Sequence, residues 1–132
     1  MENELRDYFD RAMDLVLRDL PVYIHKLIAE VPLIVEDHPS PEIMEEFGME
    51  HPDELCGLHD GIALTDRSVE GSDVPMPDAI YIYREGIFAL SLDDEGYVEP
   101  EELYKQIRIT ILHEIGHHFG LDEDELARLG YA

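Results

Sequence analysis

Hydrophobic residues recur at helical spacing near both ends of the chain. Between residues 4 and 20 the apolar positions follow one another at intervals of three and one, with arginine and aspartate on the other face. This pattern predicts an amphipathic helix that Pro21 limits. Between residues 100 and 119 an apolar residue recurs every four positions, and a second apolar strip runs beside it. Because both flanks of this second helix are apolar, we expect it in the centre of the fold.

The chain between these helices shows shorter patterns. Clusters of β-branched and aromatic residues favour three strands, at residues 31–36, 61–65 and 79–84. Apolar runs favour small helices at residues 22–29, at 41–47 (with Ser40 as cap and Pro41 first) and around Leu126 and Leu129. Residues 48–60 and 66–77 favour irregular loops, while residues 86–92 fit either a hairpin strand or a short helix.

The most specific signal lies in the second long helix, where the sequence reads His113-Glu114-Ile115-Gly116-His117. This is the H-E-x-x-H motif of zinc-binding helices. Residues four apart lie on one helical face, so two imidazoles can reach one metal ion with bonds of about 2.0–2.1 Å. Glu114 then lies where it can take a proton from a water molecule. We therefore predict one zinc ion bound by His113 and His117, with Glu114 as general base.

A third ligand is expected just after this helix. Gly120 can adopt the left-handed conformation that turns the chain back toward the metal. Glu123 follows three residues later, at the third-ligand spacing of H-E-x-x-H-x-x-G-x-x-E. A carboxylate binds zinc at about 2.0–2.2 Å. Asp122 and Asp124 flank Glu123, so the register of the third ligand stays open among these three acids.

The motif and its surroundings resemble the minimal zincin family of small zinc metallopeptidases. The likeness rests on residues 113–120 with the acids and Leu126 that follow, on residues 58–68 and on residues 77–83. It implies an α+β fold in which a small mixed sheet packs against an N-terminal helix and the central H-E-x-x-H helix. It also implies one zinc ion and hydrolysis of peptide bonds. The family motif usually has Asp where this chain has Glu123, so the loop must accommodate one more methylene group.

The amino-acid composition limits which binding partners and which cellular compartment we expect. Nine basic residues against 32 acidic residues give a net charge of −23 over 132 residues. Such a surface repels nucleic acids and anionic membranes and favours cationic partners and divalent ions. The acidic first residues, the absence of a membrane-spanning apolar run and the single cysteine, Cys56, favour a cytoplasmic protein. The length and a hydrophobic content of 45% suit one domain over residues 1–132.

Four other residues carry weaker signals. His51 and His59 lie in a polar stretch, where we expect them to be solvated rather than to bind metal. His118 points about 100° away from its neighbour His117 on the helix, so we interpret it as a packing or hydrogen-bonding residue, or one that orients a metal ligand. Gly116 costs about 1 kcal/mol relative to alanine in a helix, which suggests that another backbone approaches closely there.

These features together predict a zinc metallopeptidase that cleaves a peptide or protein substrate, with the substrate added as a strand at the sheet edge. Candidates for stabilising the oxyanion are Tyr81, Tyr83 and Tyr131. Only nine residues follow Glu123, so we expect an open cleft that a protein partner would complete. The alternative is a non-catalytic zinc-binding or interaction module, in which His59 or Asp122 supplies a fourth ligand and closes a structural site.

Overall fold

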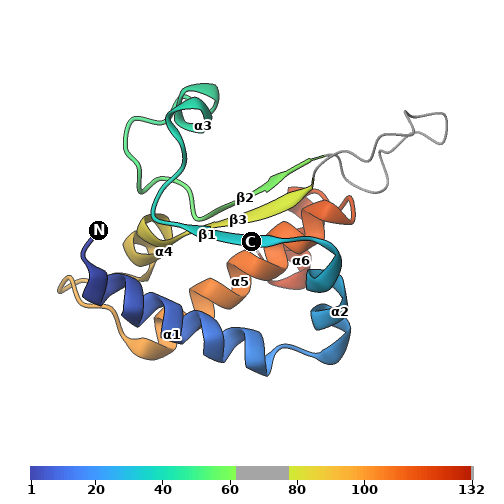
Figure 1. Cartoon of the computed structure of the whole chain (residues 1–132), viewed down its shortest axis with the longest axis horizontal. Coiled ribbons are helices and arrows are strands. Elements are labelled where there is room, and N and C mark those ends of the chain that lie inside the picture. The colour runs from blue at the N-terminus through green and yellow to red at the C-terminus, as the bar shows by residue number, and fades with distance from the viewer. Residues whose placement is uncertain (62–77, 132) are drawn as a thin grey trace.

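The computed structural model describes residues 1–61 and 78–131, in which helices surround three short strands (Figure 1). In chain order the elements are α1 (Asn3–Asp19), α2 (Val22–Glu30), β1 (Leu33–Glu36), α3 (Pro41–Glu46), β2 (Gly57–Asp60), β3 (Ala79–Tyr83), α4 (Arg84–Ser91), α5 (Pro100–His118) and α6 (Glu123–Leu129). None of these described helices is long and apolar enough to cross a membrane. The chain is therefore of the predicted α+β class.

The sheet is small and mixed. β3 lies in the middle, parallel to β1 and antiparallel to β2, in the order β1-β3-β2. Val35 of β1 and Gly57 of β2 both lie opposite Ile82 of β3. β2 is therefore an edge of the sheet within the described part of the chain. An edge strand leaves one row of backbone N–H and C=O groups available for a further strand.

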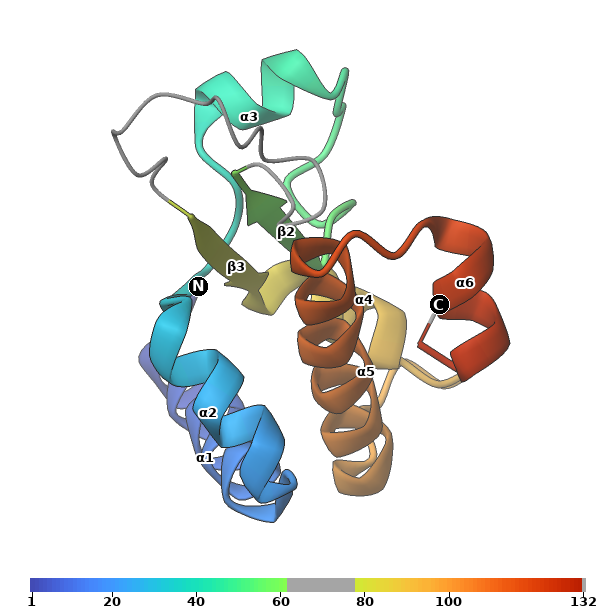
Figure 2. The ribbon, with the colours of Figure 1, turned by 90° about the vertical axis from the view of Figure 1, so that its right-hand side faces the viewer.

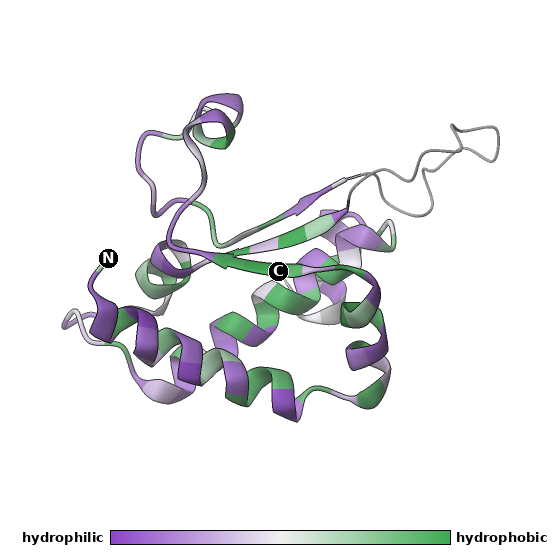
Figure 3. Ribbon diagram, viewed as in Figure 1, coloured by the Kyte–Doolittle hydropathy of each residue, from purple (hydrophilic) through white to green (hydrophobic). Residues whose placement is uncertain are grey.

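Helices α1 and α5 lie together on one face of the sheet, and α3 stands on the other side (Figures 1 and 2). The four-residue recurrence of α5 faces the core, where Ile107, Ile111 and Ile115 are buried against the apolar side of α1. Figure 3 shows hydrophobic residues along β1 and β3 and on parts of α1 and α5. Two positions along a helix turn the side chain by about 200°, so burial of Ile111 and Ile115 directs His113 and His117 outward.

The structure corrects one expectation about the middle of the chain and bears on only the first residue of another. Residues 48–60 are not irregular throughout, because Gly57–Asp60 form β2. The strand expected at 61–65 does not begin at Gly61, which is a bend with φ +144°, and residues 62–65, like the expected loop at 66–77, lie outside the described residues. β2 contains His59 and Asp60 among its four residues, so its strand conformation comes from pairing with β3 and not from β propensity.

The other elements follow the sequence closely. Residues 86–91 of the ambiguous segment 86–92 belong to helix α4, which begins directly where β3 ends, while Leu92 forms an isolated β-bridge with Val98. The predicted cap of α3 is confirmed, since Ser40 Oγ accepts a hydrogen bond from the Ile43 N–H at 3.3 Å and Pro41 is the first helical residue. The sequence thus located the helices better than the strands, because a helix is specified by its own residues and a short strand by its neighbours.

An ionic cluster joins α1, α4 and the end of β1. Asp37, which follows β1, pairs with Arg6 of α1 at 2.6 Å and with Arg84 of α4 at 3.0 Å. Arg84 also pairs with Asp10 of α1 at 3.0 Å. The hydrogen bonds from Arg6 lower the pKa of Asp37, because they stabilise its ionised form. This cluster ties the N-terminal helix to elements that come later in the chain.

Candidate metal centre

His113 and His117 lie one turn apart near the C-terminal end of α5. Their Nε2 atoms are 3.1 Å apart, and their side chains are 19% and 28% exposed. The two rings make an edge contact with centroids 4.7 Å apart and planes at 80°. Both rings therefore direct one nitrogen to the same point at the protein surface, as the H-E-x-x-H spacing predicted.

A backbone carbonyl orients each ring. Nδ1 of His117 lies 3.1 Å from the carbonyl oxygen of Leu121, and Nδ1 of His113 contacts the carbonyl oxygen of Tyr131. A carbonyl oxygen only accepts hydrogen bonds, so Nδ1 carries the proton, and Nε2 of the neutral imidazole then carries a lone pair. Two lone pairs that face each other at 3.1 Å repel, and a cation within reach of both removes that repulsion.

The turn after α5 brings Glu123 to these two nitrogens. Gly120 adopts the left-handed conformation, with φ +86°, as predicted. Oε1 of Glu123 lies 2.9 Å from Nε2 of His117 and 3.3 Å from Nε2 of His113. The neighbouring Asp122 caps the N-terminus of α6 instead, because its carboxylate accepts a hydrogen bond at 2.8 Å from the N–H of Glu125. Among the described contacts of the acids after Gly120, only those of Glu123 reach both histidines.

The three candidate ligand atoms form a nearly equilateral triangle with sides of 2.9, 3.1 and 3.3 Å. Tetrahedral zinc with bonds of about 2.0–2.2 Å holds its ligand atoms about 3.3 Å apart. The donor set of two imidazoles and one carboxylate is also one that zinc accepts, with a fourth position left open. The residues present therefore fit a zinc ion in both spacing and chemistry.

Glu114 lies beside this triangle and is only 7% exposed. Its Oε2 is 3.9 Å from Nε2 of His113. Gly57 lets β2 lie close to it, since a Cβ at that position would meet Cγ of Glu114 at 3.2 Å and Cγ2 of Thr110 at 2.8 Å. Burial raises the pKa of Glu114, against the opposing effects of the two histidines and of a backbone hydrogen bond from His59. A carboxylate with a raised pKa binds a proton more readily at neutral pH, which suits a general base.

These groups line a cleft of about 610 Å³. One wall is β2 and the residues that precede it, and the floor is the end of α5 with the turn that leads to α6. None of the described residues that line the cleft is a tyrosine. Tyr83 is almost fully buried in the central strand, and Tyr131 contributes its backbone carbonyl to His113. The geometry therefore gives no support to Tyr81, Tyr83 or Tyr131 as oxyanion-stabilising residues.

Gly116 explains how α6 reaches its place. A Cβ at Gly116 would overlap Cδ2 of Leu126, which is fully buried. The expected close approach therefore exists, but it is made by a side chain, and the prediction of a second backbone is wrong. The carbonyl oxygen of Gly116 also accepts a hydrogen bond from the Leu121 N–H at 3.0 Å. Together these contacts hold α6, and Glu123 at its first position, against α5.

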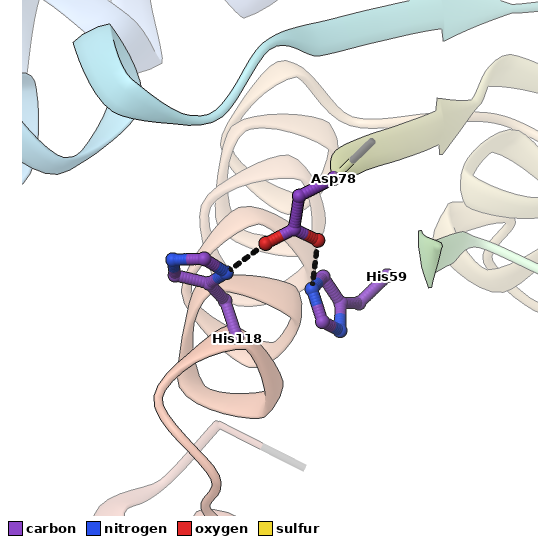
Figure 4. A group of neighbouring side chains, drawn as sticks. All are labelled: His59, Asp78 and His118. Carbon is purple, nitrogen blue, oxygen red and sulfur yellow. Dashed lines mark hydrogen bonds and ion pairs between the residues drawn. The ribbon is translucent and has the colours of Figure 1, made fainter. Parts of the chain in front are cut away.

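The expectation that His59 is solvated is wrong. Its side chain is 7% exposed, and Nε2 lies 2.5 Å from Oδ1 of Asp78, the residue that precedes β3. His118 points away from His117, as predicted, and its Nδ1 lies 2.6 Å from Oδ2 of the same carboxylate (Figure 4). Sequence spacing could not reveal this group, because 59, 78 and 118 are far apart in the chain. His51 is exposed, as expected.

An H-E-x-x-H helix against a small mixed sheet, with a carboxylate that faces both histidines after a left-handed glycine, is typical of the zincin class of fold and site. The model of the zincin-like metallopeptidase family matches residues 28–131, which is most of the chain. The chain belongs to this family. No curated protein matches the sequence significantly. The resemblance to minimal zincins is thus confirmed at the level of the family.

Proposed function

We propose that this protein is a zinc-dependent peptidase whose metal is bound by His113, His117 and Glu123. The observation that carries the proposal is the triangle of two Nε2 lone pairs and one carboxylate oxygen, with sides near 3 Å. Membership of the zincin-like metallopeptidase family supports the same metal and the same class of reaction. The fold and the orienting carbonyls explain how this chain would hold the three ligands.

Zinc bound there would supply a Lewis acid, which polarises a peptide carbonyl and lowers the pKa of water. Glu114 accepts the proton from the attacking water and then donates it to the nitrogen of the leaving amine. Its position next to His113 and its raised pKa suit both transfers. The N–H of His59 hydrogen-bonds the carboxylate of Glu114 and so keeps it directed at the cleft.

The substrate in this proposal is an extended peptide or a protein segment. β2 lines the cleft and presents a free backbone edge within the described sheet, so an extended chain can pair with it. The net charge of −23 favours substrates with basic residues and disfavours acidic ones. The open cleft also leaves room for a protein partner that would cover part of the site.

The substitution Glu114→Gln tests the proposal most directly. The amide keeps the volume but cannot accept the proton, so we expect peptide hydrolysis to fall by about 10²- to 10⁴-fold. Zinc content should stay unchanged, because Glu114 is not one of the three ligands. The matched control is Glu101→Gln, on an exposed position of the same helix, which should leave both quantities unchanged. Digestion of a peptide library, together with metal analysis, gives both measurements.

The same proposal predicts the sign of the pH dependence. A general base must be ionised, and burial raises the pKa of Glu114 above that of an exposed glutamate. Activity should therefore fall as the pH drops through the pKa of Glu114. A profile of kcat/KM against pH for the wild type measures this limb. A flat profile in the acidic range would contradict the role of Glu114.

The rival function is a non-catalytic module with a closed, structural metal site. Such a site needs a fourth protein ligand, for which the sequence offered His59 and Asp122. Asp122 caps α6 and His59 faces Asp78, so neither side chain is directed at the triangle of ligands. A wild type that carries zinc but cleaves nothing in a broad peptide library would favour the rival. A wild type that cleaves peptides only when zinc is present would exclude it.

A further inference from the structure

The described residues include a second group of side chains that could hold a metal ion. It consists of His59 from β2, Asp78 before β3 and His118 from the last turn of α5, and we call it the buried histidine group (Figure 4). Their side chains are 7%, 10% and 6% exposed. One ligand atom from each residue lies within 4.8 Å of the other two. Three separate segments therefore converge on one small, solvent-excluded point.

Hydrogen bonding explains only part of this arrangement. Oδ1 of Asp78 lies 2.5 Å from Nε2 of His59, which is shorter than the distance of about 2.7–2.9 Å usual for a charge-assisted N–H···O hydrogen bond. Nδ1 of His118 is 2.6 Å from Oδ2, but no well-aligned hydrogen bond joins it to any described residue. A buried nitrogen without an aligned partner costs free energy. A cation next to the carboxylate would use the lone pair of that nitrogen.

The chemistry of the three donors suits a divalent transition ion. Two imidazoles and one carboxylate form a ligand set found with zinc and with iron, cobalt or nickel. Bonds of about 2.0–2.2 Å at the tetrahedral angle require the donor atoms to lie about 3.3 Å apart. The two imidazole–carboxylate contacts, at 2.5 and 2.6 Å, would have to open by about 0.7–0.8 Å to reach that spacing. The strongly acidic chain also concentrates divalent cations around itself.

We propose that His59, Asp78 and His118 bind a second divalent ion, with zinc as the expected metal. This ion would be shielded from substrate, because the three side chains are nearly inaccessible to solvent, whereas the cleft centre is open. It joins β2, the start of β3 and the end of α5 through three metal–ligand bonds. It thereby fixes the segment whose His59 N–H holds the carboxylate of Glu114. The proposal stands apart from the proposed peptidase activity, since neither site supplies a ligand to the other.

Metal counting tests the proposal on the full chain. Protein freed of metal with a chelator, loaded with Zn²⁺ and separated from free ions should retain two ions. The double variant His113→Ala with His117→Ala should retain one ion, and Asp78→Asn should also retain one. The control His51→Asn, at an exposed histidine, should retain two. Circular dichroism of each variant establishes that the fold is intact before its ions are counted.

The outcomes separate the two sites. If the wild type binds one ion and the double variant binds none, the second site is disproved while the cleft centre stands. If the double variant keeps every ion of the wild type and Asp78→Asn loses one, the cleft centre fails and the buried site stands. Should Asp78→Asn not fold, anomalous scattering at the zinc edge from wild-type crystals decides. A peak bonded to His59, Asp78 and His118 is expected, and its absence at saturating zinc overturns the proposal.

Discussion

His117 and His118 are consecutive residues of α5, yet they enter two very different surroundings. His117 is 28% exposed, donates its Nδ1 proton to a backbone carbonyl and turns Nε2 toward His113 and Glu123. His118 is 6% exposed and turns Nδ1 toward the carboxylate of Asp78. One step along the helix therefore separates an open centre from a closed one. The same residue type serves two tasks because the helix turns about 100° between them.

The comparison shows that the hydrogen-bond partner of one ring nitrogen decides whether the other ring nitrogen of the histidine is available to bind a metal. In the open centre a carbonyl, which only accepts, fixes the proton on one nitrogen and frees the other for metal. In the buried group one carboxylate faces both rings directly. Exposure adds the second difference, since a substrate can reach only the centre in the cleft. Four experiments can break or sharpen this contrast.

The largest effect is expected when His117 and His118 are replaced by alanine in two separate variants. His117→Ala should weaken zinc binding in the cleft by at least about 100-fold, because changes only in the partners of ligands already cost 10–100-fold. His118→Ala should instead remove the ion of the buried histidine group and leave the cleft ion bound. Isothermal titration with Zn²⁺ measures both, with His51→Ala as the exposed control. Identical losses in the two variants would mean that the chain has one shared site.

The third ligand gives the next largest effect. Glu123→Ala should lower the zinc affinity of the cleft centre by at least the roughly 10- to 100-fold that the loss of a ligand's hydrogen-bond partner costs, and it should not change the buried group. Asp124→Ala is the matched control, since it removes an exposed acid one residue further on and should leave the affinity within experimental error. Titration with Zn²⁺ in competition with a chelator resolves this difference. A greater loss with Asp124→Ala would show that the register of the third ligand is wrong.

Gly116→Ala tests how the open centre depends on α6. The new Cβ overlaps Leu126, and overpacking of this kind costs about 1–3 kcal/mol. Alanine's better helix propensity returns about 1 kcal/mol, so we expect a net loss of up to about 2 kcal/mol in the free energy of unfolding by urea. In a Leu126→Ala background the same change should be neutral or stabilising, because the overlap is gone. A loss of equal size in both backgrounds would contradict the contact.

The smallest effect lies outside both histidine groups. Asp37→Asn removes the charge that Arg6 and Arg84 share, so it should lower the melting temperature by a few degrees at pH 7. The pKa of Asp37 is lowered in the folded protein, so its contribution is present above the ordinary carboxylate pKa and is lost as the pH falls below it. The difference between wild type and variant should therefore shrink toward pH 3. Calorimetry at several pH values measures it, and a difference that grows in acid would refute the assignment.

The sequence predicted the cleft centre far better than the buried group, for a physical reason. His113, His117 and Glu123 lie within eleven consecutive residues, so helix geometry and one left-handed glycine determine their meeting. His59, Asp78 and His118 meet only through the pairing of β2 with β3 and the packing of α5 on the sheet. Strand β2 was missed for the same reason, since its four residues have little strand propensity of their own. Local geometry could be predicted, and long-range pairing could not.

The short span of the cleft ligands also bears on how the molecule folds. Closing a chain segment costs entropy that grows with its length, so contacts between near neighbours form quickly and distant ones slowly. The pair α5 and α6 can bring its three donors together before the sheet is complete. The contact between His59 and His118 can form only after β2 has paired with β3 and packed against α5. We therefore expect zinc added during refolding to be captured early at the cleft, and the docking of β2 to be the later and slower phase.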